Sequence, residues 1–305
     1  MKAMPVRHDD AWPELPLDAW SDTYATLHMW SQVVGKVRLA KAPPVNHWWH
    51  VPLYLTSRGL TTSPIPDDDR TFQMDFDFLD HRLGIVTSDG ASRDLALRPM
   101  TVADFHEKTM ATLGDLGIEA EIWPVPVEVP EPIPFPDDLV HAAYDPKWAN
   151  RFWHALAQCD RVTKAFRDDF LGKASPVHFF WGSFDLASTR FSGRKAPPHP
   201  GTPGVPESIT REAYSHECWS AGWWPGAGLG EPAFYAYAYP EPEGFRDWAV
   251  EPAAAYYHDE LREYVLLYEA VRTSDDPDAL LLSFLRTTYE AAAERGKWDR
   301  ATLER

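Results

Sequence analysis

Cysteine is almost absent from this sequence. Its 305 residues include only two, Cys159 and Cys218, which lie far apart. Two cysteines at this separation exclude a disulfide framework and the paired cysteines of a zinc knuckle. The same scarcity is typical of proteins of the reducing cytoplasm, so we expect a cytoplasmic protein.

Long apolar runs are also missing. No stretch reaches the length of about 20 apolar residues that a helix needs to span a bilayer. Residues 1–16 contain no apolar segment that could act as a signal peptide. We therefore expect no membrane partner, in agreement with the cytoplasmic location.

Positive charge is scarce as well. The chain has 29 lysines and arginines against 46 aspartates and glutamates, which gives a net charge of −17. Such a chain repels phosphate backbones, so no nucleic-acid partner is expected. A Walker loop and a GxGxxG turn are both missing, so we expect no nucleotide cofactor. A GxSxG elbow is missing too, which disfavours a serine hydrolase.

Aromatic residues, by contrast, are abundant. The chain has 14 Trp, 12 Tyr and 15 Phe. These side chains bury large apolar areas, so the chain can build a sizeable core and still have rings left to line a pocket. The length corresponds to one large domain or two of ordinary size, at roughly 150 residues per domain. A small-molecule ligand is the partner we expect.

The apolar pattern predicts the same order of elements twice. In the first part we expect a helix from about residue 21, strands over 47–62, 72–78 and 85–87, and a helix over 99–114. In the second part we expect a helix over 145–170, strands over 177–191, 214–224 and 233–239, and two closing helices over 253–271 and 276–296.

A proline-rich stretch separates the two parts. Residues 123–136 contain six prolines, a density that no helix and no central strand accepts. We predict a stiff, extended connector. The expected organisation is a first repeat over residues 1–122, this connector, and a second repeat with a C-terminal helix over residues 137–305.

Short stretches of the two parts also resemble each other. Residues 44–50 are similar to residues 176–181, and upstream of them Leu27-His28 and Gln32 match Trp153-His154 and Gln158. The alternative is that aromatic strands after helices look alike by chance. We predict an α+β fold of two pseudo-equivalent halves, each helix–antiparallel strands–helix, with an extra C-terminal helix. Ligand sites favour the interface between such halves.

The densest group of polar residues lies in the second half. His178, His216 and a carboxylate, Glu217 or Asp185, could act as acid–base groups in a cavity lined by rings. His178, His216 and Glu217 could instead bind a divalent metal such as iron, zinc or manganese. On a regular strand His178 and Asp185 face opposite sides, unless Gly182 forms a bulge. Histidines bonded within a β core are the structural alternative.

Basic residues near this group suggest recognition of an anion. Arg190 and Arg194 flank Ser192, in a turn rich in hydrogen-bond donors that could hold a carboxylate or phosphate. Arg58 occupies nearly the matching place in the first half. Surface charge at a strand end is the alternative. Trp181 and Trp224 are expected as apolar walls of the site.

A long loop follows these residues. Residues 194–206 include five prolines and two glycines, and loops of this length without secondary structure are usually functional or disordered. Since proline restricts the chain, we predict a flap that covers the site. His199 in this flap is expected to point inward and to join the catalytic groups.

Several segments together resemble a known family. They are residues 12–16 (WPELP), residues 46–49 (NHWW), the run from His178 to Arg194, and Ser215-His216-Glu217. Over nearly the whole chain they resemble a bacterial domain-of-unknown-function family of about 300 residues. The resemblance implies a cytoplasmic bacterial protein and implies no activity, substrate or catalytic residue.

From the residues we therefore expect a small-molecule enzyme. Its His/carboxylate site would lie mainly in the second half, and arginines would recognise an anionic group of the substrate. The alternative is a non-catalytic small-molecule-binding protein with an aromatic cavity. The two differ in one respect, because an enzyme needs titratable groups that converge, whereas a binding protein does not.

Overall fold

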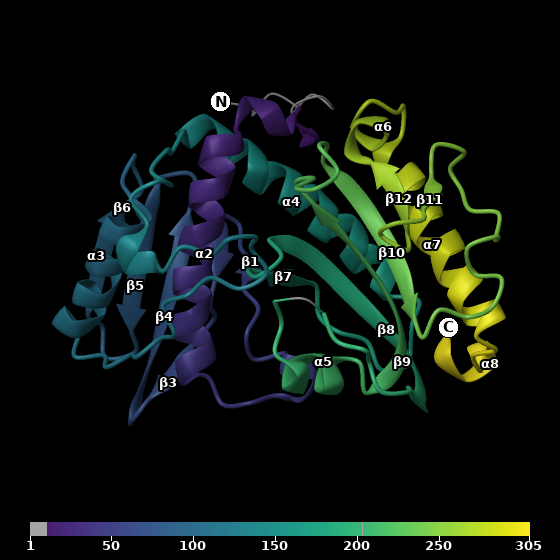
Figure 1. Cartoon of the computed structure of the whole chain (residues 1–305), viewed down its shortest axis with the longest axis horizontal. Helices are drawn as coiled ribbons and strands as arrows, with labels where there is room; N and C mark the ends of the chain where they lie inside the picture. Colours follow the sequence, from purple (N-terminus) through teal and green to yellow (C-terminus); the bar gives the residue numbers. More distant parts are fainter. Residues whose placement is uncertain (1–10, 203) are drawn as a thin grey trace, which may run out of the picture.

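The protein has an α+β fold made of two similar halves. A computed structural model describes residues 11–202 and 204–305. Each half contains a long helix and a six-stranded antiparallel sheet. In Figure 1 most of the first sheet lies to the left of helix α2 and the second sheet lies to the right, where β1 of the first sheet meets β7 of the second.

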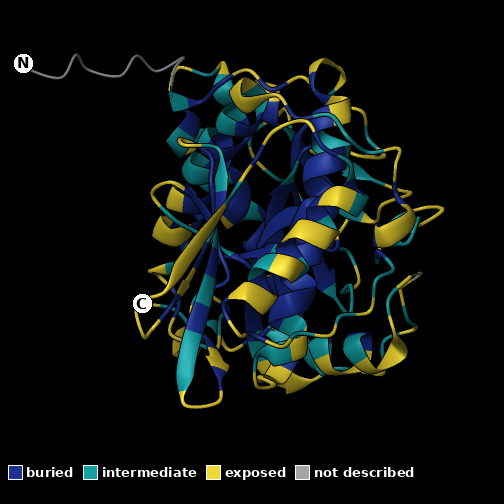
Figure 2. Cartoon of the chain, turned by 90° about the vertical axis from the view of Figure 1, so that its left-hand side faces the viewer, coloured by how far each residue is buried: buried dark blue, intermediate teal, exposed yellow. Residues whose placement is uncertain are grey.

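The first half begins with α2 (Ser21–Lys41) and ends with α3 (Val102–Asp115). Its sheet has the strand order β1-β2-β4-β5-β6, with β3 paired to β4. The strands are β1 (Tyr54–Leu55), β2 (Gly59–Thr61), β3 (Ile65–Asp67), β4 (Arg70–Asp77), β5 (Arg82–Thr87) and β6 (Ser92–Ala96). Helix α3 buries one side and exposes the other (Figure 2).

The second half begins with α4 (Pro146–Arg167). Its sheet has the order β11-β12-β10-β9-β8-β7. The strands are β7 (His178–Phe180), β8 (Asp185–Lys195), β9 (His216–Trp224), β10 (Ala233–Tyr239), β11 (Tyr256–His258) and β12 (Glu263–Leu267). The other helices are α5 (Glu207–Ala213), α6 (Tyr268–Arg272), α7 (Pro277–Arg295) and α8 (Arg300–Leu303).

Local sequence signals explain the elements that were predicted well. Asp145 accepts a hydrogen bond from the backbone N–H of Lys147, and Pro146 occupies the first turn, so α4 begins where the sequence indicated. In β4 the alternating residues Phe72, Met74 and Phe76 are buried. They face the core because successive side chains of a strand point to opposite faces.

Three predicted elements are wrong. Residues 46–48 form a short 3₁₀ turn in place of a strand, with φ of 60° at His47 and 61° at Trp48. The predicted strand over 177–191 is a hairpin, in which residues 181–184 join β7 to β8. The predicted helix over 253–271 consists largely of β11 and β12, because the apolar run in β12 pairs with β10.

The proline-rich connector packs against the rest of the protein. Gln32 of α2 bonds Val127 twice, since its amide donates to the Val127 carbonyl (2.9 Å) and its oxygen accepts from the Val127 N–H (2.9 Å). Phe135, in the short 3₁₀ turn Phe135–Asp137, is fully buried. Val127 in the middle of the connector is therefore held on α2, and its end at Phe135 is anchored in the core.

The two faces of the second sheet have different neighbours. Residues of one parity, such as Leu186, Arg190 and Trp219, lie on the face that α4 and α7 cover. The opposite face carries Asp185, Thr189 and Ser220, and of the α-helices in the described part of the chain only the short α5 lines the cavity on it. This second face is where a ligand could approach.

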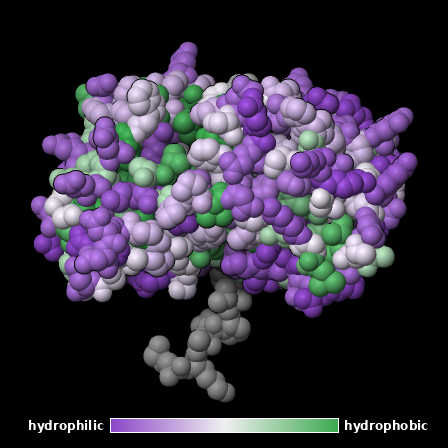
Figure 3. Space-filling view, turned by 90° about the horizontal axis from the view of Figure 1, so that it is seen from below, coloured by the Kyte–Doolittle hydropathy of each residue, from purple (hydrophilic) through white to green (hydrophobic). Residues whose placement is uncertain are grey.

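The surface agrees with the acidic composition. Seen from below, hydrophilic residues cover most of the protein and apolar groups form small patches (Figure 3). A search of the described residues found no helix with the length and hydropathy of a membrane span.

Candidate functional site

A cavity of about 230 Å³ opens on the uncovered face of the second sheet. Its floor comes from β7, β8, β9 and β10, and its sides come from residues 47–49, the connector, the flap and α5. The residues that line it are His47, Trp49, Glu128, Phe180, Ser183, Asp185, Ala187, Thr189, Phe191, Thr202, Val205, Ile209, Thr210, Ala213, Tyr214, Cys218, Ser220, Tyr235 and Tyr237. The volume lies below the range typical of drug-sized ligands, so it suits a compact molecule.

Asp185 forms the polar centre of the floor. It is 7% exposed, and its carboxylate accepts hydrogen bonds from the hydroxyls of Ser183 and Tyr235. Burial raises the pKa of Asp185, and these two donors counteract part of that rise because they stabilise the ionised form. Asp185 therefore presents a buried carboxylate whose orientation is fixed from two sides.

Two pairs of hydroxyls line the same cavity. The hydroxyls of Tyr214 and Tyr237 lie 2.8 Å apart, and those of Thr189 and Ser220 lie 2.9 Å apart. Burial raises the pKa of Tyr214 and Tyr237 well above the ordinary value, so both phenols are neutral at physiological pH. They can donate or accept hydrogen bonds, but they cannot form an ion pair with a ligand.

Glu128 reaches the cavity from the connector. The residue as a whole is exposed, but its carboxylate packs so closely on Gly182 that a Cβ there would clash with Oε1. Desolvation by the surrounding protein and then the charge of Asp185 raise the pKa of Glu128 to about 7. A carboxyl group with this pKa is both donor and acceptor of protons near neutrality.

His47 closes the side of the cavity next to α5. Its Nδ1 donates to the Ala213 carbonyl (3.0 Å), and its Nε2 accepts from Lys173 Nζ (2.7 Å). Burial lowers the pKa of His47, so the ring is neutral at neutral pH. The same ammonium of Lys173 lies 5.3 Å from the Trp49 ring and 5.4 Å from the Phe191 ring. The positive φ at His47 places this ring in the cavity wall.

Among the predicted catalytic residues, Asp185 lies in the cavity and His178 lies behind it. The β7–β8 hairpin pairs Phe180 with Asp185 and His178 with Ala187, so all four share one face. The predicted Gly182 bulge is thus part of a turn. His178 is 1% exposed, lies between the rings of Trp49 and Tyr54, and has no hydrogen bond on either ring nitrogen. Burial lowers its pKa to about 3.

The residues predicted as metal ligands are not brought together. His216 bonds the hydroxyl of Ser215 and lies 5.8 Å from the His47 ring, beside the cavity. Glu217 lies on the opposite face, where it accepts from Ser192 (2.9 Å) and from Arg194 Nε (2.8 Å). Over residues 11–202 and 204–305 we find no group of three or more His, Cys, Asp or Glu that could hold a metal ion.

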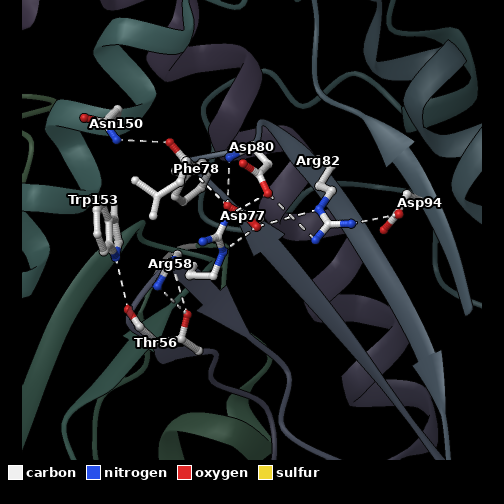
Figure 4. Close-up of polar contacts among 11 residues, drawn as sticks. Thr56, Arg58, Asp77, Phe78, Asp80, Arg82, Asp94, Asn150 and Trp153 are labelled. Carbon is white, nitrogen blue, oxygen red and sulfur yellow. Dashed lines mark hydrogen bonds and ion pairs between the residues drawn. The ribbon is translucent and has the colours of Figure 1, made fainter.

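The predicted anion-binding arginines lie outside the cavity. Arg190 is on the covered face, 3.7 Å above the ring of Phe166, and Arg194 is engaged with Glu217 and with the carbonyl of Lys297 (3.1 Å). Arg58 belongs to the first half, where it contacts Asp77 and Asp80 at 2.7 Å each (Figure 4). The three guanidinium groups therefore occupy three separate places.

The two tryptophans predicted as walls do not line the cavity, whereas the predicted flap does. Trp181 packs on Gly35 of α2 and donates to the Val51 carbonyl (2.8 Å), and Trp224 lies beside Tyr235 without lining the cavity. The flap does contribute to the cavity, through Thr202 and Val205. His199 stacks on Tyr214 with the ring centroids 4.4 Å apart, so it supports a lining residue from outside.

Several lining residues had not been singled out from the sequence. The tyrosines of β10 carried a visible signal, because Tyr235, Tyr237 and Tyr239 alternate with alanines and so occupy one face. Glu128 carried no local signal, since the fold of the connector brings it in. His47 and Trp49 belong to the segment 44–50 that resembles residues 176–181, and that similarity does not indicate that they line a cavity.

Comparison with known proteins gives a family and no activity. The model of one family, described as a family of unknown function (DUF5996), matches residues 12–305. Neither a curated protein nor a solved structure matches the chain.

Proposed function

Because the chain belongs to DUF5996, a family of unknown function, we propose its function from the cavity: the protein is a small-molecule enzyme that works by acid–base catalysis, with Glu128 as the proton-transferring group. The substrate is a compact molecule that fits about 230 Å³. Catalysis takes place in the cytoplasm, a location supported by two buried, unpaired cysteines.

One observation carries this proposal. Glu128 is accessible in the cavity and has a pKa of about 7, so both of its protonation states are populated at neutral pH. A general acid or base is most effective when its pKa lies near the working pH, and shifted carboxyl groups in clefts are frequent at catalytic sites.

The surroundings of Glu128 support a catalytic role over simple binding. Asp185, Tyr214 and Tyr237 line the same cavity, so titratable and hydrogen-bonding groups converge on one ligand. The rings of Trp49, Phe180 and Phe191 would also suit the rival function, a non-catalytic protein with an aromatic cavity. The two functions differ in whether the ligand leaves chemically changed.

A comparison of three proteins tests the proposal. Wild type, Glu128→Gln and Glu263→Gln are each incubated with an extract of cytoplasmic metabolites, and mass spectrometry records what is consumed and formed. Glu263 is the matched control, because burial also raises its pKa, to about 8, although it does not line the cavity.

We expect wild type and Glu263→Gln to convert at least one metabolite and Glu128→Gln to convert it at least about 100-fold more slowly, the size of a typical acid–base contribution. The pH profile of wild-type turnover should change near pH 7, the pKa of Glu128. A protein that retains a metabolite unchanged in all three samples would be the binding protein.

A further inference from the structure

Buried aspartates in this protein are almost all paired with a basic side chain. Among the described residues, five aspartates are less than 9% exposed: Asp67, Asp77, Asp138, Asp160 and Asp185. Three of them form ion pairs at 2.7 Å, Asp67 with Lys41, Asp77 with Arg58 and Asp160 with Lys164. Asp138 contacts the His141 ring at 2.7 Å, a partner that carries charge only when it is protonated. Asp185 forms no ion pair with any residue in 11–202 or 204–305.

This exception requires a physical explanation. A buried carboxylate without a counter-charge is costly, because the protein interior solvates it less well than water does. Ser183 and Tyr235 supply two neutral hydrogen bonds, which compensate only part of that cost. Asp185 has no positive partner among the described residues and burial raises its pKa, so a cation that entered from the cavity would stabilise its ionised form.

The walls of the cavity fit a cation as well. They include rings from Trp49, Phe180, Phe191, Tyr214, Tyr235 and Tyr237, and none of the described lining residues is Lys or Arg. Aromatic faces attract cations, and cages of such rings recognise ammonium ligands. The protein already uses this attraction at the rim, where the ammonium of Lys173 lies over Trp49 and Phe191.

We propose that the cavity binds a small organic cation, a protonated amine, with Asp185 as its counter-ion and the aromatic rings around it. The inference rests on the proposed function, because it names the substrate class of the same cavity. The ammonium group lies against Asp185 at the floor, and the remainder of the ligand extends toward Glu128 and the flap. Arginine recognition of an anion has no role in this arrangement.

Three probes of nearly equal shape test the charge of the ligand. Benzylamine is cationic at pH 7, benzyl alcohol is neutral and benzoate is anionic. Titration calorimetry with the full-length protein gives the dissociation constant of each. We expect benzylamine to bind at least about tenfold more tightly than benzyl alcohol, as one charge-assisted hydrogen bond allows, and benzoate to bind most weakly.

Two aspartate variants test whether Asp185 causes the preference for benzylamine over benzyl alcohol. Asp185→Asn should bind benzylamine and benzyl alcohol about equally, because it keeps the shape of the side chain and removes the charge. Asp160→Asn is the matched control, since Asp160 is also 7% exposed and lies in the same half but outside the cavity. It should keep the wild-type preference.

The results separate this inference from the proposed function. Equal binding of the three probes to wild type, or tightest binding of benzoate, would contradict the proposal that the cavity binds a cation. Unchanged turnover in Glu128→Gln together with a clear benzylamine preference would overturn the catalytic role of Glu128 and leave the cation site in place. No turnover in any of the three proteins, with the same preference, would overturn the enzyme and leave the cation site in place. If Asp185→Asn does not fold, the wild-type probe series and Tyr235→Phe decide. Tyr235→Phe keeps the charge and should retain the preference.

Discussion

The two sheets have similar architecture and use their carboxylates differently. On the first sheet Asp77 contacts Arg58, Asp94 contacts Arg82 (2.9 Å), and Asp75 accepts from Gln73. On the second sheet the aspartate of the open face, Asp185, meets only hydroxyl donors among the described residues. Two of these three aspartates of the first sheet thus have an arginine as counter-charge, whereas Asp185 has no basic partner among the described residues.

This difference has a consequence for the stability of the two sheets. A paired carboxylate favours the folded state, whereas an unpaired buried carboxylate opposes it. Sites that bind or react often retain groups that lower stability. The comparison therefore predicts opposite effects of the same substitution in the two sheets.

The largest effect is expected in the first sheet. Asp77→Asn removes the ion pair with Arg58 and should lower the free energy of unfolding at pH 7 by about 1–2 kcal/mol, because Arg58 is partly solvent-exposed. Burial alone would raise the pKa of Asp77, but Arg58 and two backbone donors lower it. The stabilisation is present above the unfolded-state pKa of about 3.9 and disappears as the pH falls through the folded-state pKa. Urea unfolding at several pH values measures it.

A smaller effect of opposite sign is expected in the second sheet. Asp185→Asn should raise the free energy of unfolding at pH 7 by roughly 1 kcal/mol, because it removes an uncompensated charge. The folded-state pKa of Asp185 is raised, so wild-type stability falls as the pH rises from about 3.9 through that value. The two proteins should therefore become equally stable near pH 3. A loss of stability at pH 7 would mean that Asp185 contributes to the core as Asp77 does.

The smallest effect on stability is expected at Gly182. Gly182→Ala places a methyl group against the Glu128 carboxylate, which can move away because it is accessible, so the stability change should stay within about 0.5 kcal/mol. The displaced carboxyl should regain solvent, and its pKa should fall from about 7 toward the ordinary value. NMR titration of Glu128 measures this shift.

Gly114→Ala in α3 is the matched control for Gly182→Ala. Apart from neighbouring residues and the backbone of α3 itself, no atom of the described residues lies within 4 Å of the Cβ that it would add, and it is in the first half. The Glu128 titration should be unchanged in this variant. An identical titration in Gly182→Ala would show that the Gly182 contact does not set the position of Glu128.

Much of the fold could be predicted because its signals are local. The alternation over residues 72–78 depends on the two faces of one strand, and the start of α4 depends on Asp145 and Pro146. The predicted helix over 253–271 failed because pairing with β10 decides the structure of β12. The division at the connector stays a prediction.

The site was harder to predict because it is assembled from distant segments. Asp185 and Arg190 are five residues apart on β8. Because this number is odd, their side chains point to opposite faces of the sheet. The turn at residues 181–184 returns His178 to the face of Asp185, and no periodicity reveals such a turn. Glu128, His47 and Trp49 reach the cavity only through tertiary packing.

The position of Glu128 in the connector has a consequence for synthesis on the ribosome. Glu128 and His47 leave the ribosome well before Tyr237, the last residue in sequence that lines the cavity. At a translation rate of 5–20 residues per second, Glu128 exists for roughly 5–20 s before its cavity can form. The first sheet can fold during that interval. Glu128 cannot pack into the cavity until β7, β8, β9 and β10 have been synthesised.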